Sequence, residues 1–355
     1  MKFSPAEKRQ LLIFGLVAFG VPYLMGLAMW YVYRAGGDTS AFANAQMMYP
    51  AAGAMLALLA TNKGKRPLPR LFYIGFLALT GLMALCCLAS VFAPALPWLT
   101  VVSLVLIGGS LVLWGLYLAD GKRRRTAGGL RLTQTGGSSP VWMVLLFLAL
   151  YLGRLLLLAA AAKLSDPAVT LEQLGFSTNW LYTAINFAAL PLNFFLACAA
   201  FFGEEYGWRG FLQPLLQKRF GLRGGVVLLG VLWGFWHLPL NVFYYSPSTW
   251  LQSLTNQIVL CVCLAVFFGY AQLKTRTVWV PVILHYLNNN LIAVFAGSAD
   301  VIQNQTIAWL DVLLTGLSLA VLYLPFLASK VFCSGQPQAL PLPVQDEPAQ
   351  DPQPQ

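Results

Sequence analysis

The hydrophobic positions of this chain form long, nearly uninterrupted runs that are separated by short polar connections. An α-helix needs about 20 apolar residues to cross the hydrocarbon core of a bilayer. Windows of this length predict ten membrane spans, of which the second is short: 11–33, 44–61, 71–92, 98–119, 141–162, 180–202, 224–244, 256–272, 278–296 and 307–328. The pattern therefore predicts an all-α protein, a polytopic bundle of transmembrane helices.

Composition supports this interpretation and excludes two other classes of protein. Of the 355 residues, 58% are hydrophobic and only 10% are charged, which is more apolar than a soluble core can accommodate. The net charge of +10 would suggest a nucleic-acid partner in a soluble domain, but here the basic residues lie between apolar runs. Five of the six cysteines fall within predicted spans, where thiols behave as small hydrophobes, so a disulfide framework is not indicated. They are Cys86, Cys87, Cys198, Cys261 and Cys263.

The distribution of basic residues predicts the orientation of the chain. All 22 Lys and Arg residues fall in one alternating set of connections, except Arg34, Arg154 and Lys163. Basic connections stay on the cytoplasmic side of a membrane. We therefore expect an integral, multi-pass protein of a bacterial cytoplasmic membrane with both termini in the cytoplasm. Arg154 falls inside the fifth span, where a snorkelling side chain, a carbonyl partner and a substrate contact all fit its position.

Three regions are expected along the chain. Residues 1–139 contain the N-terminal spans and end in a flexible basic cytoplasmic loop at 120–139, which is rich in Arg and Gly. Residues 140–330 form the C-terminal transmembrane domain, and the Pro- and Gln-rich residues 331–355 form a disordered cytoplasmic tail. Within the C-terminal domain, residues 211–220 mix apolar and basic side chains, which favours an amphipathic helix lying at the membrane interface.

Two adjacent carboxylates follow directly on the sixth apolar run, Trp180 to Phe202. Because charge at membrane depth is costly, an acid pair at this position indicates a functional site. Glu205 and Arg209 are four residues apart with the acid first, which favours an ion pair on one helix face. Glu204 lies about 100° around the helix and is left without this partner. We expect the Glu205–Arg209 pair to support the structure at the cytoplasmic end of the span, and Glu204 to perform chemistry.

The two histidines of the chain, His237 and His285, both fall in later spans of the same region. Histidine is the side chain best suited to proton transfer near neutral pH. Asn289 follows His285 by one helical turn, so both can donate hydrogen bonds toward one developing oxyanion. Asn241 follows His237 at the same spacing, but Pro239 between them disturbs the helix. These residues together favour hydrolysis inside the membrane.

Three ordered motifs resemble those of the CPBP family of intramembrane proteases, also called ABI or type II CAAX prenyl endopeptidase-like. The family pattern is EExxxR, FxxxH and HxxxN. The matching segments are Glu204-Glu205-x-x-x-Arg209, Trp233-x-x-x-His237 and His285-x-x-x-Asn289. The resemblance covers about residues 180–296. Trp233 stands where the family usually has phenylalanine, an exchange of aromatic residues that preserves a packing role.

The resemblance implies a glutamate-dependent endopeptidase that hydrolyses a peptide bond of a membrane-delivered protein or peptide. Glu204 and His237 would activate a water molecule, His285 and Asn289 would hold the tetrahedral oxyanion, and the Glu205–Arg209 pair would shape the site. No cofactor is then needed. In the alternative zinc-dependent mechanism, Glu204, His237 and His285 would be the metal ligands, because one carboxylate and two histidines form a reasonable catalytic set.

Two alternative hypotheses from other functional classes remain. A non-catalytic membrane immunity or scaffold protein would keep the family core for folding alone, with polar residues joining helices. A haem protein would use His237 and His285 as axial ligands, although this leaves the acid motif unexplained. The expected partners are the lipid bilayer and a membrane protein or peptide substrate, not nucleic acid.

Overall fold

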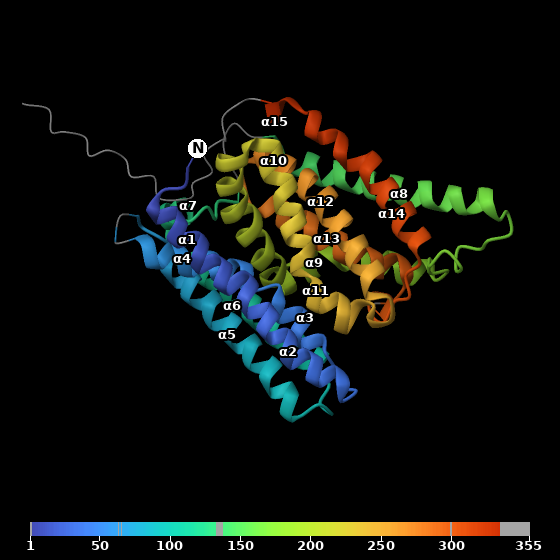
Figure 1. The fold of residues 1–355 in the computed structure, drawn as a ribbon, viewed down its shortest axis with the longest axis horizontal. Coiled ribbons are helices and arrows are strands. Elements are labelled where there is room, and N and C mark those ends of the chain that lie inside the picture. Colours follow the sequence, from blue (N-terminus) through green and yellow to red (C-terminus); the bar gives the residue numbers. More distant parts are fainter. Residues whose placement is uncertain (1, 63, 65, 133–137, 299, 334–355) are drawn as a thin grey trace, which may run out of the picture.

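A computed structural model describes residues 2–62, 64, 66–132, 138–298 and 300–333. Within these ranges every regular element is helical. The N-terminal helices form a tilted layer on one side of the molecule, and the helices from α8 onward form a second group against it (Figure 1). The predicted all-α bundle is confirmed.

The N-terminal layer begins with a continuous helical stretch, in which a π-turn, η1 (Leu16–Gly20), joins α1 (Pro5–Gly15) to α2 (Val21–Arg34). Ser4 starts α1 with a capping box, because its hydroxyl and the Glu7 carboxylate accept hydrogen bonds from each other's backbone N–H. The other helices of this layer are α3 (Ser40–Gln46), α4 (Tyr49–Asn62), α5 (Arg70–Phe92), α6 (Trp98–Ala119) and α7 (Gly121–Ala127).

The C-terminal group contains the candidate site. Its long helices are α8 (Pro140–Ser165), α9 (Trp180–Glu205), α10 (Gln213–Trp236), α12 (Trp250–Thr275), α13 (Trp279–Ala296) and α14 (Trp309–Tyr323). Shorter elements connect or follow them: η2 (Tyr206–Leu212), α11 (Leu238–Leu240), η3 (Asn241–Tyr245), η4 (Pro247–Thr249), η5 (Asp300–Ile302), η6 (Leu324–Ala328) and α15 (Lys330–Cys333).

Eight helical stretches in the described part of the chain are long and apolar enough to cross a membrane. One of them, Trp180–Tyr245, has 66 residues and contains both the sixth and the seventh predicted spans. The predicted span 44–61 corresponds to the end of α3 and to α4, which has only 14 residues. The difference from ten spans therefore arises from one merged stretch and one helix that is too short to cross a bilayer unaided.

The stretch after the acid pair folds as a helical hairpin. The chain continues as helix from α9 through η2 into the first part of α10 and then reverses at Gly221, which has φ 79°. Glycine is suited to this turn because it adopts positive φ without steric cost. Gly225 on the returning arm packs directly on the Leu216 and Gln217 backbone. Glu204 and His237 lie about 17 and 16 residues from the turn, so at 1.5 Å per residue both are about 25 Å from it along the helix axes.

This hairpin corrects two expectations. The Glu-Glu segment does not end its helix, because the helix runs on for about four more turns. The segment 211–220 is not an interfacial amphipathic helix, because its side chains from Phe211 to Gln217 are buried, apart from a half-buried Pro214. Only the end next to the turn is exposed. The sequence pattern is misleading here because the polar groups of this arm are buried inside the protein instead of facing water.

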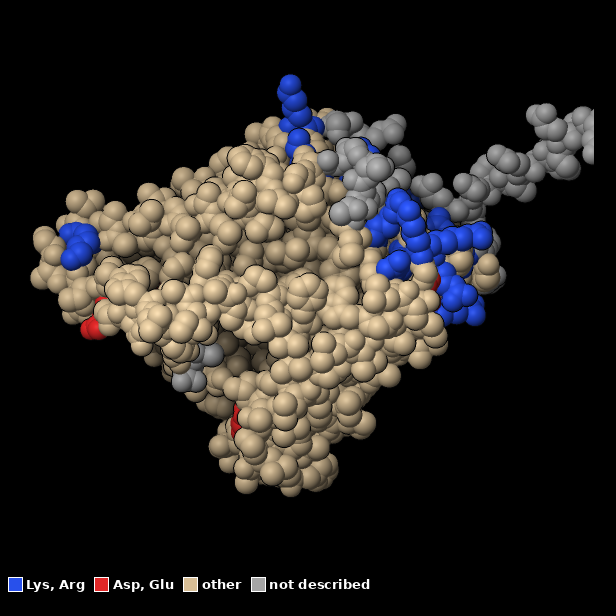
Figure 2. Space-filling model, turned by 180° about the vertical axis from the view of Figure 1, so that it is seen from behind, with Lys and Arg blue, Asp and Glu red and all other residues tan. Residues whose placement is uncertain are grey.

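The basic side chains of the described residues gather mainly at the end of the bundle where α1 and α7 lie, with a broad uncharged face beside them (Figure 2). Arg209 is an exception, since it is completely buried and does not belong to a connection. Which end faces the cytoplasm remains a prediction from the positive-inside rule.

The expected flexible loop 120–139 is ordered over its described first part. It forms α7 and then places Leu130 in the core. The Leu130 carbonyl oxygen accepts hydrogen bonds from Tyr117 Oη and Trp279 Nε1 at 3.0 Å each, which ties this segment to α6 and α13. Residues 133–137 of this loop lie outside the described residues. Of the predicted disordered tail 331–355, residues 331–333 belong to helix α15, which corrects the prediction there, and the part from 334 onward lies outside the described residues.

Close backbone packing joins the N-terminal layer to the hairpin. A Cβ atom at Gly203 would lie 2.3 Å from the Met47 carbonyl oxygen, and one at Gly207 would lie 2.4 Å from the Pro50 carbonyl carbon. In addition, Gln46 Nε2 donates a hydrogen bond to the Trp236 carbonyl oxygen at 2.8 Å. The N-terminal helices therefore pack directly against the helix that carries the acid motif.

We predict that Gly207→Ala destabilises the protein by about 1–3 kcal/mol, because the added methyl group meets backbone that cannot move independently. The matched control is Gly81→Ala in α5, where an added Cβ meets nothing within 4 Å. Thermal unfolding of both variants in the same detergent compares them. Equal midpoints for the two variants would contradict this account of the packing.

Candidate active site

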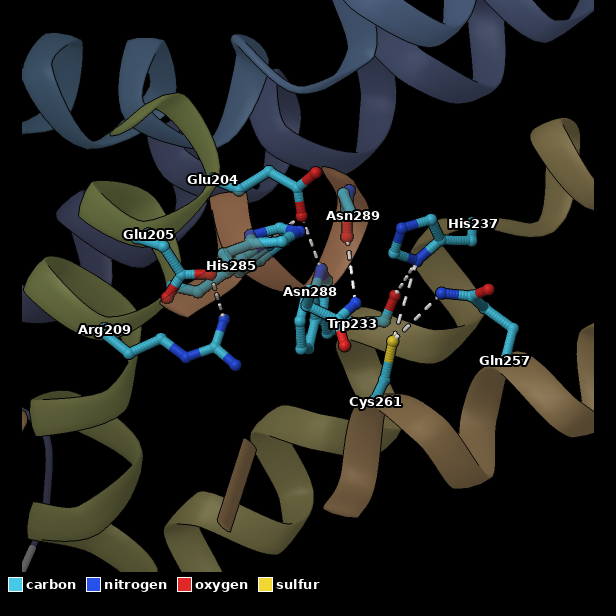
Figure 3. A network of polar contacts seen from close by, with 11 residues as sticks. Glu204, Glu205, Arg209, Trp233, His237, Gln257, Cys261, His285, Asn288 and Asn289 are labelled. Carbon is cyan, nitrogen blue, oxygen red and sulfur yellow. Dashed lines mark hydrogen bonds and ion pairs between the residues drawn. The ribbon is translucent and has the colours of Figure 1, made fainter. Parts of the chain in front are cut away.

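The predicted site residues come together where the hairpin meets α13 (Figure 3). Glu204 lies near the end of α9, His237 directly follows α10, and His285 and Asn289 lie one turn apart on α13. The first three side chains are buried, and Asn289 is exposed. Segments that are up to 85 positions apart in the numbering thus contribute to one cluster.

Glu205 is the centre of a buried charged network. Its Oε1 atom lies 3.0 Å from Arg209 Nη1 and 2.8 Å from His285 Nδ1. The Arg209 guanidinium also stacks over the Trp233 ring, with Cζ 4.2 Å from the ring centroid. The ion pair predicted from the spacing is therefore present, and it also orients a histidine on another helix. A buried charge requires such partners.

Two indole groups hold the neighbouring carboxylate, Glu204. Trp233 Nε1 donates a hydrogen bond to its Oε2 atom at 2.6 Å, and Trp208 Nε1 donates to the same atom at 3.3 Å. The sequence assigned Trp233 a packing role only, and a phenylalanine at this position would lack the donor. Trp208 was missed, although it follows Glu204 by four residues and so shares its helix face.

The ring of His237 is oriented by its own helix end. Its Nδ1 atom lies 2.8 Å from the Trp233 carbonyl oxygen. A carbonyl oxygen only accepts hydrogen bonds, so Nδ1 carries the proton and the Nε2 atom of the neutral ring keeps its lone pair. Asn241 has a structural contact, since its Nδ2 atom donates to the His237 carbonyl oxygen at 2.9 Å. His237 therefore presents a proton acceptor.

A cavity of about 280 Å³ opens beside this cluster. Its wall includes Trp233, His237, His285 and Asn289. The remaining lining residues come mainly from α8, α12, α13 and the segment before α14: Tyr151, Arg154, Tyr245, Ser253, Asn256, Gln257, Leu260, Cys261, Leu264, Asn288, Ile292, Ile302, Gln305, Ile307 and Thr315. Because Trp233 both lines the cavity and contacts Glu204, it connects the buried carboxylate with this space.

The segment that matches known proteins contains this cluster. Residues 186–291 match the family model of type II CAAX prenyl endopeptidase Rce1-like proteins. The resemblance to the CPBP family is confirmed over this segment. The chain is also 32% identical over 108 residues to the CAAX prenyl protease 2 of the archaeon Methanococcus maripaludis.

The similarity to that protein is partial. The alignment covers 28% of this chain and 39% of the relative's length. No solved structure matches the chain. The family model includes Glu204, His237, His285 and Asn289, whereas the N-terminal layer described above lies outside it.

A zinc ion at this site would need Glu204, His237 and His285 as its ligands. In both histidines the Nδ1 atom lies within hydrogen-bond distance of an acceptor oxygen, as is common in zinc-bound histidines. However, no group of three His, Cys, Asp or Glu side chains in the described part of the chain could hold a metal ion. The Glu204 Oε2 atom is instead occupied by two indole donors. Glu204, His237 and His285 are therefore not grouped as metal ligands in this arrangement, and no step below is routed through a metal.

We predict that Arg209→Gln destabilises the protein by about 3–5 kcal/mol, because it leaves the buried Glu205 carboxylate without its cation. A matched control is Arg124→Gln, which breaks an ion pair to Asp120 whose arginine side chain is 54% exposed. That pair contributes about 0–1 kcal/mol. Thermal unfolding midpoints in detergent should separate the two variants clearly, and similar shifts would show that the Glu205 network is not a major support.

Proposed function

We propose that this protein is an intramembrane endopeptidase of the CAAX-protease type that hydrolyses a peptide bond of a membrane-delivered protein or peptide. The observation that carries the proposal is that the second and third motifs line one cavity and hold the buried first motif, through the Trp233–Glu204 and His285–Glu205 contacts. A site enclosed by transmembrane helices acts on substrates that reach it through the bilayer. Burial of Glu204, His237 and His285 strengthens electrostatic interactions with a reacting group.

In the proposed reaction, Glu204 and His237 activate a water molecule for attack on the carbonyl carbon. His237 offers the Nε2 lone pair toward the cavity, since its Nδ1 proton is engaged with the Trp233 carbonyl oxygen. Glu204 is an anionic acceptor in which two indole donors fix the orientation of the carboxylate. The proton taken from water is then passed to the leaving amine, which completes hydrolysis without a covalent intermediate.

Asn289 and His285 would stabilise the tetrahedral oxyanion. Asn288 Nδ2 donates to Asn289 Oδ1 at 3.0 Å, which orients the Asn289 amide and leaves its Nδ2 atom as a donor. His285 donates from Nε2 only when its ring carries both protons. The Glu205 Oε1 atom lies 2.8 Å from Nδ1 and orients the ring. Donors placed before the reaction starts are the main source of oxyanion stabilisation.

Glu204→Gln tests this function, because it keeps the shape of the side chain and removes the anionic acceptor. Membrane-associated and released peptides are compared by mass spectrometry between cells that express the wild-type chain and the variant at matched levels. Glu172→Gln is the matched control, since Glu172 is an exposed carboxylate that accepts a hydrogen bond from Thr178. We expect one precursor to accumulate uncleaved with Glu204→Gln alone.

An unchanged peptide profile with folded, membrane-inserted Glu204→Gln protein would contradict the proposal. It would favour the non-catalytic immunity or scaffold function, in which the family core serves folding. A profile that changes equally with Glu172→Gln would show that the effect does not arise from the site.

A further inference from the structure

The cavity wall contains a cation that the proposed hydrolysis does not use. Arg154 lies on the membrane-spanning helix α8 and lines the cavity together with Tyr151, one turn before it. Its Nε atom donates a hydrogen bond to Ser318 Oγ on α14 at 3.1 Å. No ion pair joins it to a carboxylate within the ranges that the structure describes.

The contrast with Arg209 shows what Arg154 lacks. Arg209 is also within the bundle, but it has the Glu205 carboxylate and the Trp233 ring as partners. A guanidinium carries five N–H donors, and a single hydroxyl acceptor leaves the charge of Arg154 uncompensated. An unpaired charge at membrane depth is costly and indicates a functional role. Because guanidinium matches the geometry of a carboxylate closely, an anionic ligand group in the cavity would supply the missing partner.

The surrounding wall is suited to a peptide. Asn256, Gln257 and Asn288 all line the cavity, and amide side chains pair with both the N–H and the C=O of a peptide backbone. The Oδ1 atom of Asn256 is buried without a hydrogen-bond partner among the described residues. Buried polar atoms are nearly always satisfied, so this side chain has an unused acceptor, which a rotation toward the cavity would offer to a ligand N–H group.

We propose that Arg154 binds a carboxylate of the substrate peptide and thereby fixes the position of the scissile bond beside His237 and His285. This inference rests on the proposed endopeptidase function and names a specificity determinant of the same site. The carboxylate is either the C-terminal α-carboxylate of the peptide or an acidic side chain. Both have the same chemistry, and synthetic peptides distinguish them.

The test measures binding without catalysis. Purified Glu204→Gln protein in detergent is titrated with three N-acetylated tetrapeptides, and the change in tryptophan fluorescence gives Kd. The first peptide is apolar with a free C-terminus, the second is the same peptide with a C-terminal amide, and the third is amidated and contains one internal glutamate. The titrations are repeated after adding Arg154→Gln, Arg154→Lys or the control Lys163→Gln, which removes an exposed charge from the same helix.

We expect a carboxylate-containing peptide to bind about 10- to 100-fold more tightly than the neutral one, as a charge-assisted contact predicts. Arg154→Gln should abolish this preference, Arg154→Lys should retain part of it, and Lys163→Gln should leave it unchanged. A preference for the first peptide assigns the α-carboxylate, and a preference for the third assigns an acidic side chain.

Equal affinity for all three peptides would overturn the proposal, and so would a carboxylate preference that survives Arg154→Gln. If Arg154→Gln does not fold, the peptide comparison on protein with Arg154 intact still decides, because equal affinities would overturn the assignment. The readout needs no proteolysis. A failure here is therefore distinct from an unchanged peptide profile with Glu204→Gln, which concerns the catalytic function itself.

Discussion

The structure depends on the buried Glu205 carboxylate, whose Oε1 atom is shared by Arg209 and His285. Removing any of these groups from water is costly, and their mutual contacts compensate only when the geometry is well fixed. The network therefore joins the first arm of the hairpin to α13. Stacking of Arg209 on Trp233 adds the second arm, and Trp233 in turn donates to Glu204. The pair that the sequence assigned to support thus determines where each candidate catalytic group lies.

The helical hairpin explains how acid and histidine reach the same depth. Gly221 reverses the chain about equally far from Glu204 and His237, so the two arms bring Glu204 to Trp233, one turn before His237. The N-terminal layer makes this position possible, because Gly203 and Gly207 allow the first arm to approach the backbone of residues 47–50. Although the family model covers only residues 186–291, the packing of its acid motif includes contacts from well outside that segment.

The sequence pattern predicted the features that depend on neighbouring residues in the chain. Apolar runs located the helices of the bundle, and the i,i+4 spacing predicted the Glu205–Arg209 ion pair. The continuation of the helix past Glu205 was not predictable in this way, because a segment with charged and aromatic residues resembles an interfacial helix until its partners in other helices are known. The indole donors to Glu204 depend on tertiary contacts for the same reason. Likewise, Leu130 in a basic connection gave no sign that its carbonyl oxygen would bond to α6 and α13.

The most direct test of the account is whether Glu204 and His237 act on the same water molecule. Single-turnover cleavage of the identified precursor would be measured for purified wild-type protein, Glu204→Gln, His237→Ala and the double variant in the same membrane mimetic. Groups that act as a unit are strongly non-additive in their effects on rate. If both residues act on one water molecule, the double variant is about as slow as the slower single variant. Rate losses that multiply in the double variant would contradict a shared role in activating water.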